Sequence, residues 1–313
     1  MPLEANLRGK EAHHDSVLMS EVLKALDIQP SDTVVDATLG GAGHFSELLS
    51  ALGEGGIIVG IDADTDAVER GREAYSLDRR PERPIAHLVN DNFRNLTRIL
   101  ERLGIAPVDK ILFDLGWSGY QIASPRGFSF QNDEPLLMTY GDSGHSTELG
   151  TSETAADIVN SSSEEDLANI IFTYGEEHFS RGIARAIVEA RSKNRILTTG
   201  ALVDAVLAGT PMWYQKRKIH PATKTFQALR IAVNDELGAL REGLTAAIRA
   251  LSLNGRLAVI SFHSIEDRIV KNILRNELQA KSLKLGKPIV ATRAEILKNK
   301  RARSAKLRIF SYA

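Results

Sequence analysis

Three glycines, Gly40, Gly41 and Gly43, lie in the segment VVDATLGGAGHFSELL, residues 34–49, after an apolar run that ends in Asp36. The β-branched pair at the start of the segment suits a buried strand, and the apolar residues after the glycines are spaced as in a helix. Glycine permits close approach of a ligand to the backbone, and the N–H groups of a first helical turn attract an electron-rich partner. Dinucleotides, phosphates and S-adenosylmethionine are all candidate ligands, and a turn that serves only packing is the alternative.

The spacing of the glycines distinguishes between these candidate ligands. A nicotinamide-binding turn has the pattern G-x-G-x-x-G, whereas residues 41–43 (GAG) are followed by three residues that are not glycine. An acid four positions before the first glycine, here Asp36, is typical of S-adenosylmethionine-dependent methyltransferases. Asp62, at the end of the next apolar run, would then accept hydrogen bonds from the ribose hydroxyls. The turn therefore favours S-adenosylmethionine, and a nicotinamide dehydrogenase is supported only by the broad α/β pattern.

Two further apolar runs end in residues that could contact a ligand, Asn92-Phe93 in the third run and Asp114 in the fourth. In open α/β sheets, ligands bind outside the carboxyl ends of the strands, so these residues should converge near the glycine turn. Phe93 could pack on an adenine, with ordinary core packing as the alternative. Asp114 could accept a hydrogen bond from the methionine amino group or from a substrate amine, with helix capping as the alternative.

The elements that position these residues follow an alternating pattern. Strand-like runs alternate with helical patterns up to residue 123, which indicates a βαβ series and a parallel sheet. Residues 124–214 contain a Gly-, Ser- and Asp-rich loop and several helical patterns, without a strong strand. Afterwards the alternation resumes, with strands expected at 256–262, 288–292 and 306–312. We predict a doubly wound, Rossmann-like α/β sheet formed by 1–123 and 215–313, with a helical insertion domain over 124–214 after the fourth strand.

Composition excludes several classes of chemistry. The 313 residues include no cysteine, which excludes disulfides, cysteine zinc sites and a thiolate nucleophile. The histidines and acids show no metal-ligand spacing, so no metal is expected to be required. No apolar run approaches the roughly 18 residues of a membrane span, and the amino-terminal residues lack an apolar signal core. We expect a cytoplasmic protein without membrane contact; no pattern points to an oligomeric state.

The chain resembles the bacterial 16S ribosomal RNA cytosine-N4 methyltransferase family in segments that follow the family's order over nearly the whole length. These segments are HDSVLMSEVL, DATLGGAGH, GIDAD, DNF, ILFDLGWSGYQ, RGFSF, YGEEHFSRGIARAIV, HPATKTFQALRIAVNDEL, GRLAVISFHSIEDRIVK and RARSAKLRI. The resemblance implies a methyltransferase domain with a helical insert, S-adenosylmethionine as donor, and N4-methylation of a cytidine in the decoding region of the small subunit. The partner would be 16S ribosomal RNA or the small ribosomal subunit. The implied cofactor contacts, with Gly41 added from the turn itself, are Gly41, Ala42, Gly43, His44, Asp62, Phe93, Asp114 and Gln121.

One segment departs from the family's pattern. Where relatives read GPLDMRMD, this chain reads EPLLMTYG, so that Leu137, Thr139, Tyr140 and Gly141 replace an acid, an arginine, a methionine and an acid. If the lost charges position substrate, RNA binding or turnover would be impaired, and the alternative function is a non-catalytic RNA-binding ribosome-assembly factor that retains the methyltransferase fold. If they only brace the insertion, an apolar contact could replace them.

The reaction implied by the resemblance places particular demands on the fourth strand end. A cytosine exocyclic amine is a poor nucleophile, so the enzyme must align it with the sulfonium methyl group. Many amine-directed nucleic-acid methyltransferases have Asp-Pro-Pro-aromatic at this place; here residues 114–117 read DLGW. We hypothesise that Asp114 is catalytic, as acceptor for the amine or for the cofactor, and that Trp117 or Tyr120 stacks on the extruded base. Methylation at cytosine C5 normally needs a cysteine, which this chain lacks.

Two basic stretches, YQKRKIHPATK and LKNKRARSAKLR, are candidates for phosphate contacts, although a role in solubility alone is the alternative. The predicted RNA-binding residues, in addition to Trp117, are Lys216, Arg217, Lys218, Arg301 and Arg303. In SFHSIEDRIVK, Ser264 with Asp267 three residues later predicts a helix amino-terminal cap. His263, just before it, is assigned no catalytic role.

Overall fold

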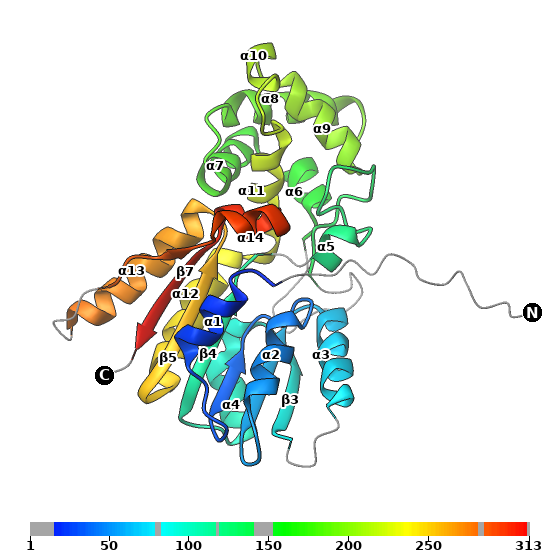
Figure 1. Ribbon diagram of the computed structural model, residues 1–313. Coiled ribbons are helices and arrows are strands. Elements are labelled where there is room, and N and C mark those ends of the chain that lie inside the picture. The colour runs from blue at the N-terminus through cyan, green and yellow to red at the C-terminus, as the bar shows by residue number, and fades with distance from the viewer. Residues whose placement is uncertain (1–15, 79–82, 117–118, 141–152, 281–284, 312–313) are drawn as a thin grey trace, which may run out of the picture.

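The computed structural model of the protein describes residues 16–78, 83–116, 119–140, 153–280 and 285–311 (Figure 1). Within these residues one sheet contains seven strands in the order β3-β2-β1-β4-β5-β7-β6. The strands are β1 (Thr33–Asp36), β2 (Ile57–Asp62), β3 (Ile85–Asn90), β4 (Val108–Asp114), β5 (Leu251–Ser261), β6 (Ile289–Val290) and β7 (Lys306–Ser311). The first five are parallel, and β7 is antiparallel to both of its neighbours.

This topology confirms the predicted doubly wound, Rossmann-like sheet. Chain order reverses between β1 and β4, and a switch point of this kind opens a crevice at the carboxyl ends of the strands. β5 begins at Leu251 rather than at Arg256, because the register against β4 shifts between Val108 and Lys110 and Asn254 takes a positive φ of 64° in the irregular part. The regular part of β5 is the apolar run that the sequence predicts.

Alternate residues of the strands supply two apolar layers, as the two-residue period of a strand requires. On one face, Val35, Val59 and Phe113 pack with helices α4 (Leu96–Leu103), α12 (Glu236–Ala250) and α13 (Ser264–Ala280). On the other face, Val34, Ile58 and Leu112 pack with α1 (Met19–Leu26), α2 (Gly43–Ala51) and α3 (Thr65–Leu77). The sheet is thus covered on both faces, which leaves its carboxyl edge as the place for a ligand.

A helical layer stands at that edge (Figure 1). Its helices are α5 (Gly119–Ala123), α6 (Ala155–Ser161), α7 (Glu164–Gly175), α8 (Ser180–Lys193), α9 (Thr199–Ala208), α10 (Met212–Gln215) and α11 (Ala222–Asn234). Helix α11 contributes Ala222, Phe226 and Leu229 to the apolar cluster of this layer, beyond the predicted domain end at 214. The boundary stays a prediction, and the packing of α11 against α7 favours a division near Asn234.

The predicted helix cap at Ser264 is wrong. The Ser264 hydroxyl donates to Glu176 of the helical layer, and Asp267 pairs with Lys306 at 2.9 Å and with Arg308 at 2.7 Å. Glu266 performs the capping, because its Oε2 accepts the backbone N–H groups of Phe262 at 2.8 Å and His263 at 3.3 Å. The first turn of α13 therefore turns one carboxylate toward the end of β5, close to the crevice.

The described residues lack two features that other classes of function would need. No helix in this part of the chain is long and apolar enough to cross a membrane. Among the same residues, no three or more His, Asp or Glu side chains gather as a metal site would require.

Candidate functional site

The glycine turn forms a tight connection between β1 and α2. Gly40 has a φ of 49° and Ala42 a φ of 60°, so two residues of the turn are left-handed. The Leu39 N–H donates to the Ile61 carbonyl oxygen at 3.1 Å, and the Leu39 carbonyl oxygen accepts the Ala42 N–H at 2.7 Å. These bonds hold the turn against β2. Ala42 itself is buried away from the crevice, whereas Gly41, Gly43 and His44 face it.

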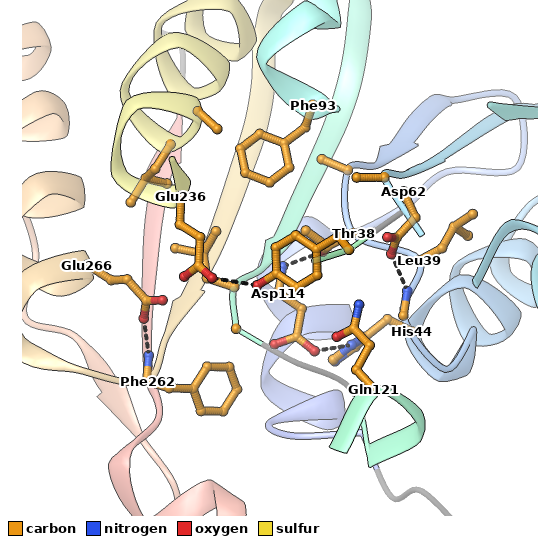
Figure 2. Close-up of a pocket in the computed structure, with 18 of the residues that line it drawn as sticks. Thr38, Leu39, His44, Asp62, Phe93, Asp114, Gln121, Glu236, Phe262 and Glu266 are labelled. Atoms are coloured by element: carbon orange, nitrogen blue, oxygen red, sulfur yellow. Dashed lines mark hydrogen bonds and ion pairs between the residues drawn. The ribbon is translucent and has the colours of Figure 1, made fainter. Parts of the chain in front are cut away.

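A pocket opens where this turn meets the carboxyl ends of the strands and the start of α12 (Figure 2). Except for Ala42, every residue of the predicted cofactor set lines it: Gly41, Gly43, His44, Asp62, Phe93, Asp114 and Gln121. Figure 2 shows Asp62, His44 and Gln121 on one side of the pocket and Glu236, Phe262 and Glu266 on the other. The turn that follows β1 and residues of β2, β4 and α5 are brought together here, as the convergence of strand ends predicts.

Asp62 is held rigidly at the end of β2. Its Oδ2 accepts the Gly40 N–H at 2.8 Å, and its Oδ1 accepts the Asp64 N–H at 2.9 Å. Burial raises the pKa of Asp62 to about 6. Behind it, the Asp64 carboxylate accepts from Arg126 at 2.7 Å and from Gln121 at 3.3 Å. The glycine turn, α3 and α5 are therefore tied together by two neighbouring carboxylates.

His44 and Asp114 form the polar centre of the pocket. The Asp114 Oδ2 lies 3.3 Å from His44 Nδ1, and His44 Nε2 lies 3.1 Å from the Val17 carbonyl oxygen. Since a carbonyl can only accept, Nε2 carries a proton. Desolvation works to lower the pKa of His44, but the hydrogen bond and negative charge of Asp114 outweigh it, and the pKa is raised. Asp114 thus faces an imidazole that favours its protonated form.

The second oxygen of Asp114 has no partner among the described residues. Asp114 Oδ1 is buried, although the side chain lines the pocket, and the Asp114 backbone N–H already donates to Thr38 Oγ1 at 2.7 Å. A buried acceptor without a donor is uncommon and costs free energy unless a ligand or water supplies the hydrogen bond. The atom is thus a ready acceptor for an N–H group that enters the pocket.

Asp36 is a second buried carboxylate behind this centre. Its Oδ1 accepts the Thr38 N–H at 3.1 Å, while its Oδ2 has no partner in the described part of the chain. Burial raises the pKa of Asp36 to about 7, although the nearby His44 works to lower it. Three carboxylates, those of Asp36, Asp62 and Asp114, therefore surround the glycine turn. A cationic ligand suits such surroundings.

The far wall of the pocket contains residues that the sequence analysis did not assign. The Tyr140 hydroxyl donates to Glu236 Oε1 at 2.7 Å, and the buried Arg230 donates to Glu236 Oε2 at 2.8 Å. The Tyr140 ring stacks on Phe128 with centroids 5.7 Å apart, and the Asn234 side chain accepts the Tyr140 N–H at 3.1 Å. Burial raises the pKa of Tyr140 well above its usual value. Tyr140 belongs to the segment that departs from the family's pattern, so this segment forms part of the wall.

A signal for this wall was present in the sequence. Glu236 lies in the segment HPATKTFQALRIAVNDEL, and Phe262 and Glu266 lie in SFHSIEDRIVK, the two most distinctive segments of the resemblance. Both segments place polar residues beside a helix start, Glu236 at the first position of α12 and Glu266 in the first turn of α13. The acidic residues at the helix starts within these two segments were therefore the clue to the second half of the pocket.

The predicted RNA-binding residues lie in separate places. Arg301 lines the pocket; desolvation lowers its pKa, while the charge of Asp114 works to raise it. Arg303 is exposed two residues later. Lys216, Arg217 and Lys218 are exposed beside α10, which Figure 1 places at the far tip of the helical layer. Trp117, like Gly141 of the altered segment, falls outside the described residues.

The MraW methylase family matches residues 11–313, which include the sheet and the helical layer. The chain belongs to this family. The resemblance seen in the sequence is thereby confirmed, and the helical layer is a part of the MraW methylase architecture rather than an addition to it.

Curated relatives carry one shared name, ribosomal RNA small subunit methyltransferase H. The relative from Deinococcus deserti is 48% identical over 296 residues, which cover 94% of this chain and 92% of the relative. The relative from Brevibacillus brevis is 43% identical and covers 95% of this chain and 97% of its own. The relative from Deinococcus radiodurans is 46% identical, and the match covers 95% of this chain and 88% of the relative. This MraW methylase chain is therefore similar to these relatives over nearly their full length.

Proposed function

We propose that the protein transfers a methyl group from S-adenosylmethionine to N4 of a cytidine in the decoding region of 16S ribosomal RNA. Family membership and the name shared by the relatives support methylation of small-subunit ribosomal RNA. The observation that carries the finer proposal is the unpartnered Asp114 Oδ1, which is buried at the pocket beside the glycine turn. An exocyclic amine supplies the donor that this acceptor lacks.

The residues around the turn fit S-adenosylmethionine. Gly41 and Gly43 allow the ligand to approach the backbone closely, and Asp62 offers acceptor oxygens to ribose hydroxyls. Phe93 offers a ring to the adenine and is held edge-on against Phe113 with centroids 5.4 Å apart. His44 and Gln121 complete the proposed contacts, and Ala42 acts by shaping the turn. When bound, the cofactor supplies an electrophilic methyl group on a positively charged sulfur, which suits the three nearby carboxylates.

Asp114 orients and deprotonates the acceptor in this proposal. Its Oδ1 accepts a hydrogen bond from N4–H, and this bond directs the lone pair of the amine toward the methyl group. The same oxygen then takes up the proton that the amine releases as the new C–N bond forms. His44 donates to the other carboxylate oxygen and fixes the orientation of Asp114, while the Val17 carbonyl fixes His44. The proton moves from N4 to Asp114 Oδ1, and no nucleophile of the protein is consumed.

The far wall is the proposed site of the target base. Tyr140, Glu236 and Phe262 surround the space across from the glycine turn, and Arg301 offers a cation to a phosphate of the target nucleotide. Glu236 is oriented by Tyr140 and Arg230, so the altered segment keeps a defined hydrogen-bonded wall despite its lost charges. Trp117 stays a proposed stacking partner of the base.

Methyl transfer from labelled S-adenosylmethionine to small subunits that lack the modification tests this proposal. Nucleosides from the product are separated and weighed by mass spectrometry, with naked 16S ribosomal RNA as a parallel substrate. Label in N4-methylcytidine is the expected result. Label in another nucleoside contradicts the acceptor atom, and tight cofactor binding without transfer to either substrate identifies a non-catalytic assembly factor instead.

A further inference from the structure

An aromatic cluster lies at the far tip of the helical layer, away from the pocket. It consists of Phe179, Trp213, Tyr214 and Arg217, which we call the tip cluster. The Phe179 ring contacts Trp213 edge-on at 5.7 Å and Tyr214 at 4.8 Å between centroids. The Arg217 guanidinium lies 5.3 Å from the Trp213 centroid and 5.2 Å from that of Tyr214. Figure 1 places α10, which contains the tryptophan, farther from the sheet than the other labelled helices.

The base of the tip cluster is anchored from inside the protein. The Tyr214 hydroxyl donates to Glu177 Oε2 at 2.5 Å, and Glu177 Oε1 accepts the Phe179 N–H at 2.9 Å. Glu177 is fully buried, so both bonds lie away from water. The Gln215 side chain adds hydrogen bonds to the carbonyl oxygens of Leu207 at 2.8 Å and Thr210 at 3.0 Å at the end of α9. The rings are thus held in a defined arrangement before any partner binds.

The outer side of the tip cluster exposes apolar surface among positive charges. Trp213 is 59% exposed, and its neighbours Met212 and Ile219 are 69% and 60% exposed. Lys216 and Lys218 are exposed on either side of Arg217 in the chain. The sequence contains no acidic residue between Asp204 and Asp235, although the whole chain has a net charge of −1. This positive charge is therefore local.

We propose that the tip cluster is a stacking platform for an unpaired nucleotide of ribosomal RNA, at a place distinct from the methylation pocket. The proposal rests on the proposed function for the identity of the RNA. Unpaired bases stack on aromatic rings and on Arg guanidinium planes, and lysines beside them neutralise the phosphates. Trp213 offers the ring, Arg217 the guanidinium plane, and Lys216 and Lys218 the flanking charges. A ribosomal protein would need acidic groups to match these cations.

Binding of small subunits that lack the modification, measured as a dissociation constant, tests the platform. Trp213→Ala is expected to weaken binding roughly 5- to 100-fold, since stacking of one base contributes that much. Trp213→Phe keeps an aromatic face and should keep most of the affinity. Phe172→Ala is the matched control, because Phe172 is 57% exposed on α7 of the same layer and is outside the cluster. Lys218→Gln should reduce the salt dependence of binding by about one phosphate contact.

Further readouts separate this proposal from the proposed function. At saturating subunits, Trp213→Ala should keep the wild-type kcat and S-adenosylmethionine affinity, with the loss confined to KM. Ultraviolet cross-linking should attach the peptide that contains Trp213 to RNA; attachment to a ribosomal protein overturns the platform. Equal binding by Trp213→Ala and Phe172→Ala also overturns it, even when the wild type methylates normally. A wild-type protein that binds subunits through Trp213 but methylates no cytidine refutes the proposed function and leaves the platform supported.

Discussion

Replacement of Asp114 is the perturbation with the largest predicted effect on turnover. Asp114→Ala removes the unpartnered Oδ1 and the partner of His44 Nδ1 at 3.3 Å. A positioned proton acceptor contributes typically about 10²- to 10⁴-fold to the rate, so kcat should fall by that factor. Asp114→Asn keeps the shape and one acceptor but loses the charge. Because an amide oxygen cannot take up the proton that Asp114 Oδ1 accepts, kcat should fall by about 10²- to 10⁴-fold in this variant too.

The assay is single-turnover transfer of labelled methyl groups to small subunits, with cofactor affinity measured separately by calorimetry. Asp109→Asn is the control, because Asp109 lies at the opposite end of β4, where it accepts the Thr33 N–H at 2.9 Å. The His44 pKa should also fall in both Asp114 variants, since the charge of Asp114 helps to raise it. An Asp114→Ala protein that turns over within about threefold of the wild type, far inside the range above, refutes the role assigned to the carboxylate.

Three further predictions concern stability. Gly127→Ala should lower the free energy of unfolding by roughly 2–4 kcal/mol, because Gly127 has a φ of 75° and an added Cβ would meet the Pro135 carbonyl oxygen. Gly104→Ala, at a φ of 67° in open space, should lower it by only about 1 kcal/mol. Equal shifts of the two variants in the chemical denaturation midpoint would contradict this contrast. Tyr140→Phe should lose about 1.5 kcal/mol of stability, because it removes the hydrogen bond to the charged Glu236. Tyr75→Phe should lose less, because the Tyr75 hydroxyl donates to the neutral Pro84 carbonyl oxygen at 3.1 Å. Thermal unfolding of both variants checks this order. The cofactor-free protein should lose stability as the pH rises from about 4 to about 7. The folded pKa values of Asp36 (about 7), Asp62 (about 6) and His44 are raised, so the stability from their protonation is lost as the pH rises through them. Asp36→Asn should flatten the melting temperature profile in this range, and an unchanged slope would count against a buried, protonated Asp36.

The glycine turn and the strand ends could be predicted because their signals are local. The two-residue period of the strands, the acid at each strand end and the glycines of the turn are all readable within a few residues. Parallel strands then bring Asp62, Phe93 and Asp114 to one edge, as the pocket shows. Ala42 was the exception, because its left-handed conformation turns it away from the crevice that its neighbours line.

The far wall and the division of the chain could not be predicted in the same way, because they depend on contacts between distant residues. Tyr140 and Glu236 are 96 residues apart in sequence, and only the packing of the helical layer joins them. Arg301 lies in a basic stretch of the sequence that predicts phosphate contacts at the surface, but η2 (Lys300–Ser304) turns it into the pocket. Ser264 matches a capping pattern, yet its hydroxyl donates to Glu176, and Glu266 accepts the Phe262 and His263 N–H groups instead. In each case a tertiary contact prevailed over a local pattern.

The central claim is that this protein methylates N4 of a cytidine in small-subunit ribosomal RNA, with Asp114 as acceptor. The most direct measurement is the nucleoside content of that RNA from cells that lack the protein, compared with cells that regain either the wild type or Asp114→Ala at equal expression. The account predicts that N4-methylcytidine is lost with the protein, returns with the wild type and stays absent or greatly reduced with Asp114→Ala. Unchanged N4-methylcytidine in cells that lack the protein would contradict the claim.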